Sequence, residues 1–354
     1  MVVYMNSYYD GTKLLSLKDL DGNTPEIFMV TTNRTAGKTT YFSRLIFNRF
    51  LKKGSKFMLI YRFKYELDDC ANKFFKDIQG LFFNEYELTS KKMATGIYHE
   101  LFCKKIGDEF GVPCGYAISL NSADQLKKLS HFFSDTECML FDEFQSETNS
   151  YCPNEVEKFV SIHKTVARGQ GKMNRYVPVY MCANPVTILN PYYVEMDISP
   201  RLTNDVKFLR GHGFVLEQGY NKAADMAQKE SGFNAAFSKN RYIAYSAEGS
   251  YLNDSTAFIE QPVGRNKYLA TIKYKGCEYG IRSYDNLGIV YCDNRPDASY
   301  PNKIAVTTDD HNVNYVMLKS NELFIAQLRF FFEQGCFRFK DLKCKEAILK
   351  MLSY

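Results

Sequence analysis

A Gly-Lys-Thr triplet near the start of the chain carries the residue types that hold the phosphates of a nucleotide. Gly37, Lys38 and Thr39 follow an apolar, strand-like run and precede a helical pattern. In loops of this kind, backbone N–H groups and the lysine contact the β- and γ-phosphates, and the threonine hydroxyl binds Mg²⁺. The segment therefore predicts an ATP and Mg²⁺ site; the alternative is a chance triplet in a structural turn.

The loop departs from the usual pattern of phosphate-binding loops, which has a leading glycine. This chain has Thr32 at that position. The leading glycine serves mainly a tight turn after the strand, so we expect a small β-branched residue to replace it. Arg34 lies inside the loop, where it either contacts a phosphate or forms an ion pair at the surface. We predict that the nucleotide is held by a continuous set of loop residues: Thr32, Asn33, Arg34, Thr35, Ala36, Gly37, Lys38, Thr39 and Thr40.

A pair of carboxylates, Asp142 and Glu143, ends an apolar run further along the chain. Asp142 is suited to hold Mg²⁺ together with Thr39, and Glu143 is suited to polarise the attacking water. Considered alone, the segment has one alternative, an ordinary buried strand that ends in a solvated acidic turn. Combined with the loop in one α/β domain, it predicts a Walker B element of the P-loop class that hydrolyses ATP, the ASCE class.

Two further polar residues follow predicted elements of the same domain. Asn184 ends an apolar run and fits a sensor of the γ-phosphate; the alternative is a turn residue before Pro185. Arg168 ends an amphipathic helical pattern over 154–168. An arginine at that position can reach the nucleotide of a neighbouring subunit as a catalytic finger. The alternative for Arg168 is a cation that stabilises the end of its own helix.

The elements that must position these residues indicate an α/β fold. Residues 26–31 form an apolar, β-prone run, the helical spacing after the loop ends at Gly54, and a second apolar run covers 56–62. This order is a βαβ unit, and continuous apolar runs are typical of strands in a mostly parallel sheet. We predict a P-loop ATPase domain over 1–205, a linker or lid over 206–245, and an α+β domain over 246–354.

Composition and charge limit the class of protein. The 354 residues are 45% hydrophobic and 24% charged with a net charge of +5, which indicates a globular protein and permits a polyanionic partner. The ten cysteines and five histidines lack the paired spacings of a zinc site, so we expect reduced thiols in a cytoplasm. No apolar run approaches the ~20 residues of a membrane span, and we expect no membrane association.

From about Ile27 to the C-terminus, the chain resembles the DNA-encapsidation ATPases of phi29-like small tailed phages, which are relatives of terminase large subunits. The resemblance is carried by segments that occur in the same order: "KFMLIYRFKYEL", "FDEF" followed by "YCPNEVEKF", "KTVAR", "CANPVTILNPYY", "IAVTTDDHN" and "GCFRFKDLKCKEAI". It implies an ATP-driven motor that moves double-stranded viral DNA into a preformed capsid. The alternatives are a P-loop helicase or another DNA translocase, and a metal-dependent nuclease of the terminase type.

The resemblance also implies roles for single residues and a set of partners. Arg168 matches the finger that acts in trans, Lys64 matches a lysine that contacts the nucleotide of the neighbouring subunit, and Arg34 matches an arginine found in the family's loop. The chain departs from the family at two loop positions, where Thr32 and Thr35 replace the family's leading glycines. The expected partners are double-stranded DNA, the portal (connector) protein and further copies of the chain in a homo-oligomeric ring, a pentamer in the family. A structural packaging RNA takes part in some relatives. The expected location is the host cytoplasm, and transiently the portal vertex of the assembling virion.

For the C-terminal domain the resemblance implies an RNase H-like fold without cleavage activity. The candidate metal ligands Asp293, Asp309 and Asp310 do not form a full acidic set in the sequence. We expect this domain to bind nucleic acid or the portal. A basic set could meet phosphates or form a solvated helix face, and consists of Arg329, Arg338, Lys340, Lys343 and Lys345.

Overall fold

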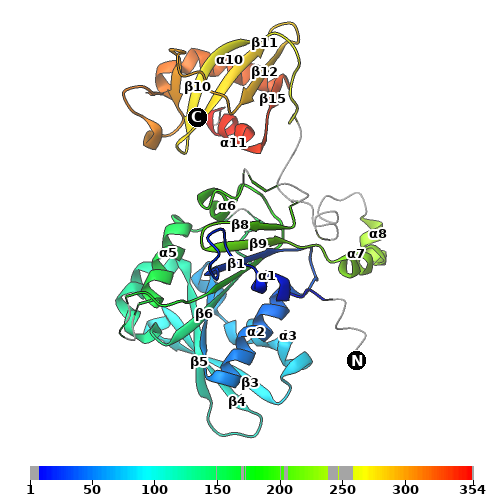
Figure 1. The fold of residues 1–354 in the computed structure, drawn as a ribbon, viewed down its shortest axis with the longest axis vertical. Helices are drawn as coiled ribbons and strands as arrows, with labels where there is room; N and C mark the ends of the chain where they lie inside the picture. The colour runs from blue at the N-terminus through cyan, green and yellow to red at the C-terminus, as the bar shows by residue number, and fades with distance from the viewer. Residues whose placement is uncertain are drawn as a thin grey trace. The chain divides into compact units, whose positions relative to one another are not determined.

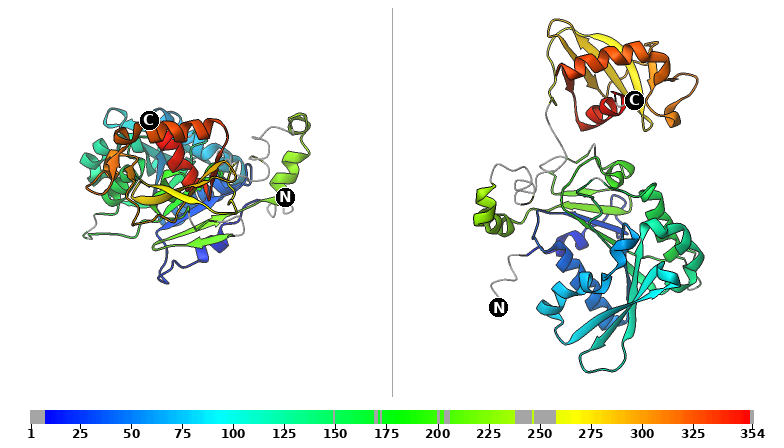
Figure 2. Two further views of the ribbon diagram at one scale, coloured as in Figure 1. Left: turned by 90° about the horizontal axis from the view of Figure 1, so that it is seen from above. Right: turned by 180° about the vertical axis from the view of Figure 1, so that it is seen from behind.

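The computed structural model of the protein describes residues 8–148, 150–168, 171, 173–199, 201–202, 206–237, 246 and 258–352. The chain divides into two compact units, Met1–Asn253 and Asp254–Tyr354, and each is described by itself (Figures 1 and 2). Within the described ranges, no helix is both long enough and apolar enough to cross a membrane.

A nine-stranded sheet forms the centre of the first unit, in the order β3-β4-β5-β2-β6-β7-β1-β9-β8. Its strands are β1 (Ile27–Thr31), β2 (Lys56–Tyr61), β3 (Tyr86–Met93), β4 (Tyr98–Lys105), β5 (Val112–Ser119), β6 (Thr136–Asp142), β7 (Val179–Ala183), β8 (Phe208–Arg210) and β9 (Phe214–Gln218). The six strands from β5 to β9 in this order are parallel. The pairs at the two edges are antiparallel. The mostly parallel sheet predicted from the sequence is therefore confirmed.

The position of β7 in the sheet decides which strand ends meet. It lies between β1 and β6, with Thr31 beside Ala183 and Asp142 beside Cys182. One strand between the phosphate-loop strand and the Walker B strand is the arrangement of the ASCE class. Because parallel strands end at the same edge of a sheet, the loop after β1, the acidic pair after β6 and Asn184 after β7 emerge side by side.

Helices cover both faces of this sheet, and each face has its own hydrophobic core (Figure 1). One face packs against α2 (Lys38–Lys53) and α3 (Cys70–Phe82), and the other against α5 (Glu155–Val166) and α6 (Pro191–Glu195). Successive side chains of β1 point alternately into the two cores. The remaining helices of the unit are α1 (Thr12–Ser16), α4 (Ala123–Leu126), α7 (Lys222–Lys229), α8 (Gly232–Ala236) and the 3₁₀ helices η2 (Lys64–Leu67), η3 (Ala94–Gly96), η4 (Leu120–Ser122) and η5 (Lys127–Phe133).

The segment 206–245, predicted to be a linker or lid, differs from that prediction in its first part. Strands β8 and β9 belong to the sheet, and β9 pairs in parallel with β1 along its whole length. They are short and joined by a turn in which Gly213 has a φ of 76°, so their sequence lacks a strand-length hydrophobic pattern. Helices α7 and α8 follow them. Residues 238–245 lie outside the described part of the chain.

The second unit is built on a six-stranded sheet in the order β14-β13-β10-β11-β12-β15. Its elements are β10 (Lys267–Tyr274), β11 (Cys277–Tyr284), β12 (Ile289–Asp293), β13 (Lys303–Ala305), η6 (Thr308–Asp310), β14 (Val316–Met317), η7 (Leu318–Asn321), α10 (Glu322–Glu333), β15 (Phe337–Phe339) and α11 (Leu342–Leu352). Strands β10, β11 and β12 form an antiparallel meander. On the other side of β10, β13 pairs in parallel with β10, and β14 pairs in parallel with β13. This is the strand plan of RNase H, as the family resemblance implies. Helices α10 and α11 share one core with the sheet.

Candidate ATP-hydrolysis site

The side chains predicted to handle phosphate and Mg²⁺ meet at the carboxyl edge of the first sheet. The Lys38 ammonium donates a hydrogen bond to the Asn184 side-chain oxygen over 2.6 Å. The Thr39 hydroxyl donates to an Asp142 carboxylate oxygen over 3.1 Å. The first two residues of α2 are thereby joined to the ends of β6 and β7. The three motifs lie far apart in the sequence and form one cluster in the fold.

The environment of Lys38 fits a nucleotide phosphate. Gly37 precedes α2 with a left-handed φ of 90°, a conformation that glycine adopts without strain. Lys38 is only 8% exposed, and burial lowers the pKa of its ammonium, while Asp142 opposes that shift. A buried cation at the N-terminus of a long helix attracts anions strongly. Thr39 and Asp142 supply the hard oxygen ligands that Mg²⁺ prefers.

The two threonines that replace loop glycines have different conformations. Thr32 is buried, its N–H donates to the Ala183 carbonyl over 3.3 Å, and its hydroxyl donates to the Asn33 carbonyl over 3.0 Å. Positive φ values belong instead to Thr35, at 60°, and to Gly37. A β-branched residue at positive φ is a rare, strained conformation. The entry turn therefore needs no glycine, and the strain of the loop is concentrated at Thr35.

Residues that follow β9 in the chain form hydrogen bonds with side chains of the phosphate loop. Asn33 is fully buried; its side-chain amide donates to the Asn221 carbonyl over 3.0 Å, and its side-chain oxygen accepts the Asn221 N–H over 2.9 Å. The Gln228 amide in α7 donates to the Thr35 hydroxyl over 3.1 Å. The Asn33 side chain thus fixes the loop to the start of α7.

Arg34 adopts the second of the two arrangements considered for it. Its guanidinium forms an ion pair with Glu147, in the segment after the Walker B strand. The Glu147 carboxylate also accepts a hydrogen bond from the Asn184 amide over 3.3 Å. A chain of polar contacts therefore runs from Lys38 through Asn184 and Glu147 to Arg34.

Glu143 differs from Asp142 in its surroundings. Its backbone has a φ of 57°, which turns its side chain away from the line of β6. Burial raises the pKa of the Glu143 carboxyl, and Asp142 and Glu147 raise it further. Burial also raises the pKa of Asp142, against the effects of Lys38 and Thr39. Glu143 borders a cavity of about 310 Å³, whose lining includes Thr39, Ser43, Tyr61, Glu66 and Asp142.

Comparison with known proteins places the chain among phage packaging proteins. The sequence model described as podovirus DNA encapsidation protein (Gp16) matches residues 5–353. The chain belongs to this family. It is 27% identical over 312 residues to a DNA packaging protein of Bacillus phage phi29, covering 87% of each chain, and 27% identical over 313 residues to a DNA packaging protein of Bacillus phage B103, covering 87% of this chain and 90% of the relative.

Solved structures of two phage motors share the fold of this family member. One is described as the bacteriophage Phi-29 viral genome packaging motor assembly, with a TM-score of 0.70, 24% identity, and coverage of 98% of this chain and 99% of the other. The second is described as the Phi-28 gp11 DNA packaging motor, with a TM-score of 0.56, 16% identity and coverage of 99% of both chains. At these identities the likeness establishes the fold.

The two residues predicted to act across a subunit boundary lie apart from the cluster. Arg168 is exposed, two residues beyond the end of α5, and Lys64 is exposed at the start of η2. The Lys64 side chain lies beside Gly96. Among the residues that the structure describes, neither side chain forms a hydrogen bond or ion pair with the phosphate loop. Both are accessible to another chain.

Sequence reasoning missed three side chains around the cluster. Glu147 pairs with Arg34, and the Gln145 side-chain oxygen accepts the N–H groups of Val186 and Thr187 over 2.9 and 3.1 Å. Arg62 is the third residue. The sequence does contain an indication of its structural role, because a charged residue directly after a buried apolar strand needs a buried partner. Glu147 and Gln145 gave no such signal, since acidic and amide side chains are ordinary in loops.

In the second unit, two of the three candidate metal-binding carboxylates contact protein donors, and the third, Asp309, is exposed in η6. Asp293 forms an ion pair with Arg282 over 3.0 Å, and Asp310 accepts the N–H groups of Lys275 and Gly276 over 2.9 and 2.8 Å. Over the described ranges, no group of three or more His, Cys, Asp or Glu side chains is placed to hold a metal ion. The basic residues are partly engaged as well, because Arg329 donates to the Leu352 carbonyl over 3.0 Å.

Proposed function

We propose that the protein is an ATPase motor subunit that moves double-stranded viral DNA into a preformed capsid. The observation that carries this proposal is the convergence of Lys38, Thr39, Asp142 and Asn184 beside Glu143, through the hydrogen bonds from Lys38 to Asn184 and from Thr39 to Asp142. Membership of the encapsidation family indicates that the substrate is DNA. Hydrolysis of ATP at this site would provide the energy for moving it.

The residues divide the chemistry as follows. Lys38 and the backbone N–H groups of the loop bind the ATP phosphates, and Thr39 with Asp142 would hold Mg²⁺, which neutralises phosphate charge when bound. Glu143 accepts a proton from the attacking water, and its raised pKa suits a base. When Lys38 turns to the phosphates it leaves Asn184, so nucleotide binding changes the contacts at the end of β7.

The site is completed by a neighbouring copy in a ring at the portal. We propose that Arg168 of one subunit approaches the γ-phosphate of the next, and that Lys64 contacts the same nucleotide, since both are exposed. A pentameric ring, contact with the portal (connector) protein and a structural packaging RNA follow from the family. The protein acts in the host cytoplasm and transiently at the portal vertex. Because Asp293 and Asp310 are engaged by protein donors, we propose that the RNase H-like unit does not cleave DNA.

The test is DNA-stimulated ATP hydrolysis by the wild type and by Glu143→Gln. Removing a general base lowers kcat by on the order of 100-fold or more. The amide keeps the shape of the side chain, so ATP binding is retained. Equal rates for the two proteins would refute the proposal. Strand separation on forked DNA would favour a helicase instead, and Mn²⁺-dependent cutting would contradict the inactive nuclease.

A further inference from the structure

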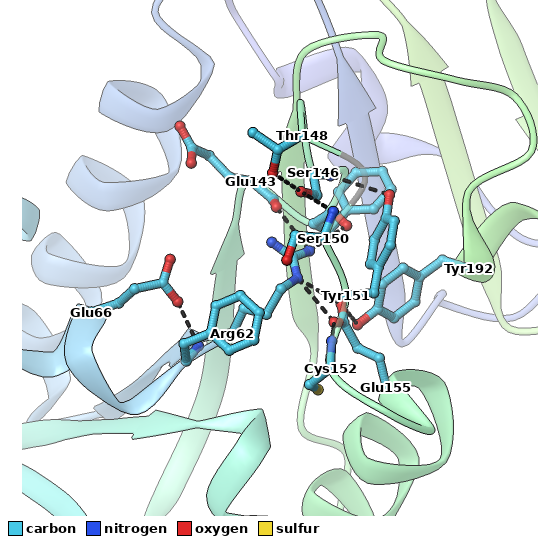
Figure 3. Close-up of polar contacts among 12 residues, drawn as sticks. Arg62, Glu66, Glu143, Ser146, Thr148, Ser150, Tyr151, Cys152, Glu155 and Tyr192 are labelled. Atoms are coloured by element: carbon cyan, nitrogen blue, oxygen red, sulfur yellow. Dashed lines mark hydrogen bonds and ion pairs between the residues drawn. The ribbon is translucent and has the colours of Figure 1, made fainter. Parts of the chain in front are cut away.

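We propose that Arg62 is a positioning residue for hydrolysis, which holds the backbone turn that carries Glu143 and joins it to helix α5. Across the described residues, Arg62 forms no hydrogen bond or ion pair with the phosphate-binding loop, and it acts through the placement of the Glu143 carboxylate. The inference rests on the proposed function of this site. Figure 3 shows the contacts around Arg62.

The guanidinium of Arg62 reaches the Walker B turn directly. Arg62 follows the last residue of β2, the neighbour of β6 in the sheet. Its Nη2 donates to the backbone carbonyls of Glu143 and Phe144 over 3.2 and 2.9 Å. The side chain is only 7% exposed, so these bonds form in a medium of low dielectric constant, where they are stronger than in water.

The turn needs such support because of its conformation. Glu143 is a non-glycine residue with a φ of 57°, a left-handed conformation that costs about 1 kcal/mol or more. Within the described part of the chain, the Glu143 carboxylate itself forms no hydrogen bond. Its position is therefore set by the backbone, and the backbone carbonyl of Glu143 is one of the two that Arg62 holds.

The other side of the guanidinium is fixed by Glu155 in the first turn of α5. Arg62 Nε donates to both Glu155 carboxylate oxygens, over 3.1 and 2.9 Å, and the Glu155 side chain is 1% exposed. Glu155 also accepts the Tyr192 hydroxyl over 3.0 Å and the Cys152 N–H over 2.9 Å. A buried ion pair with this many hydrogen bonds has one defined geometry.

One arginine thus connects β2, the turn after β6 and the start of α5. The end of α5 leads to Arg168. The buried Arg62–Glu155 pair therefore anchors both Glu143, the base of this subunit's site, and the helix that carries Arg168 toward a neighbouring subunit. Lysine keeps the charge that Glu155 needs, but its single ammonium cannot reproduce the planar fork that serves the carboxylate and two carbonyls together. Arg62→Lys therefore loosens the turn with the buried charge retained.

The experiment is a double-mutant cycle with Arg62→Lys and Glu143→Gln, measured as kcat for DNA-stimulated ATP hydrolysis and as Kd for ATP. A misplacement of about 1 Å at the reacting group costs on the order of 100-fold in rate, and we expect a loss of this size for Arg62→Lys, with Kd for ATP unchanged. In the Glu143→Gln background, Arg62→Lys is expected to have no further effect on kcat.

A matched control distinguishes positioning from general stability. Arg282, in the second unit, also joins a carboxylate to a backbone carbonyl: its Nε donates to Asp293 over 3.0 Å and its Nη2 donates to the Arg295 carbonyl over 2.8 Å. Arg282→Lys is expected to keep wild-type kcat. If Arg62→Lys unfolds the protein, Glu155→Gln tests the same pair with an isosteric change, and we expect a smaller loss in kcat with the same dependence on Glu143.

Two results would overturn the positioning role. One is an unchanged kcat in the folded Arg62→Lys variant. The other is an equal loss from Arg62→Lys, or from its Glu155→Gln replacement, in the wild-type and Glu143→Gln backgrounds. Wild-type turnover by Glu143→Gln alone would instead refute the proposed function, and the basis of the positioning role with it.

Discussion

Replacing Glu147 by glutamine is expected to tighten ATP binding. The Glu147 carboxylate pairs with Arg34 of the phosphate loop and accepts a hydrogen bond from Asn184. For Arg34 to contact a phosphate, it must leave this carboxylate. Glutamine keeps an oxygen for the Asn184 amide and removes the charge that retains Arg34. It also removes a negative charge from the neighbourhood of an anionic ligand.

The size of the gain follows from the exposure of the pair. The Arg34 and Glu147 side chains are 37% and 28% exposed, and ion pairs in contact with solvent contribute up to about 1 kcal/mol. Release of that energy corresponds to about fivefold tighter binding, since 1.4 kcal/mol is a factor of ten in Kd. The lost repulsion acts in the same direction. Because solvent reaches the pair, the gain should shrink as ionic strength rises.

The assay is a titration with a fluorescent ATP analogue in the Glu143→Gln background, where turnover does not consume the ligand. Kd is compared with and without Glu147→Gln at low and at high salt. Addition of Arg34→Gln to the Glu147→Gln protein should remove the part of the gain that comes from the release of Arg34. Equal or weaker binding by Glu147→Gln would show that Arg34 does not exchange Glu147 for phosphate, and the reasoning would be refuted.

Two further predictions concern the subunit boundary and the pH dependence of stability. Mixing Arg168→Ala with Glu143→Gln protein should restore part of the ATPase activity, because a subunit with an intact Glu143 can receive Arg168 from its neighbour; no rescue in mixed assemblies would contradict a finger acting in trans. Burial raises the pKa of Glu217, whose carboxylate accepts the Tyr9 hydroxyl over 2.7 Å. The folded protein therefore loses stability as pH rises from the ordinary Glu value of 4.5 through the raised folded value, and glutamine removes this loss. The Tm of Glu217→Gln relative to wild type should increase from acidic to neutral pH, and a difference independent of pH would count against the burial effect.

The sequence predicts the first sheet well where strands are long and fully apolar. The runs that became β1, β2, β6 and β7 stand out because strands buried on both faces carry no polar alternation. Their order then brings Lys38, Asp142 and Asn184 to one edge. Strands β8 and β9 are not predicted in this way. They have only three and five residues and lie beside glycine turns, so they are too short to show the hydrophobic pattern of a strand.

The contacts that surround the site are harder to predict than its members. The pairing of Asn33 with Asn221 joins residues 188 positions apart, and an asparagine in a loop gives no sign of such a partner. The same holds for Glu147 beside Arg34. These contacts depend on where the chain returns after the sheet is complete, and local sequence patterns carry no information on that path.

The Asn33–Asn221 contact has a mechanical consequence. In chain order, α7 follows the phosphate loop's anchor at Asn221 and precedes the second unit, which begins at Asp254. Tension on the second unit is transmitted along the covalent chain first to Ser246, whose carbonyl accepts the Arg34 N–H over 3.0 Å, and from there toward Asn221. There it acts on two hydrogen bonds of about 3 Å to the Asn33 side chain, next to a threonine held at positive φ. We expect the lifetime of bound nucleotide to depend on load, because the same anchor that shapes the phosphate loop lies on the path of the force.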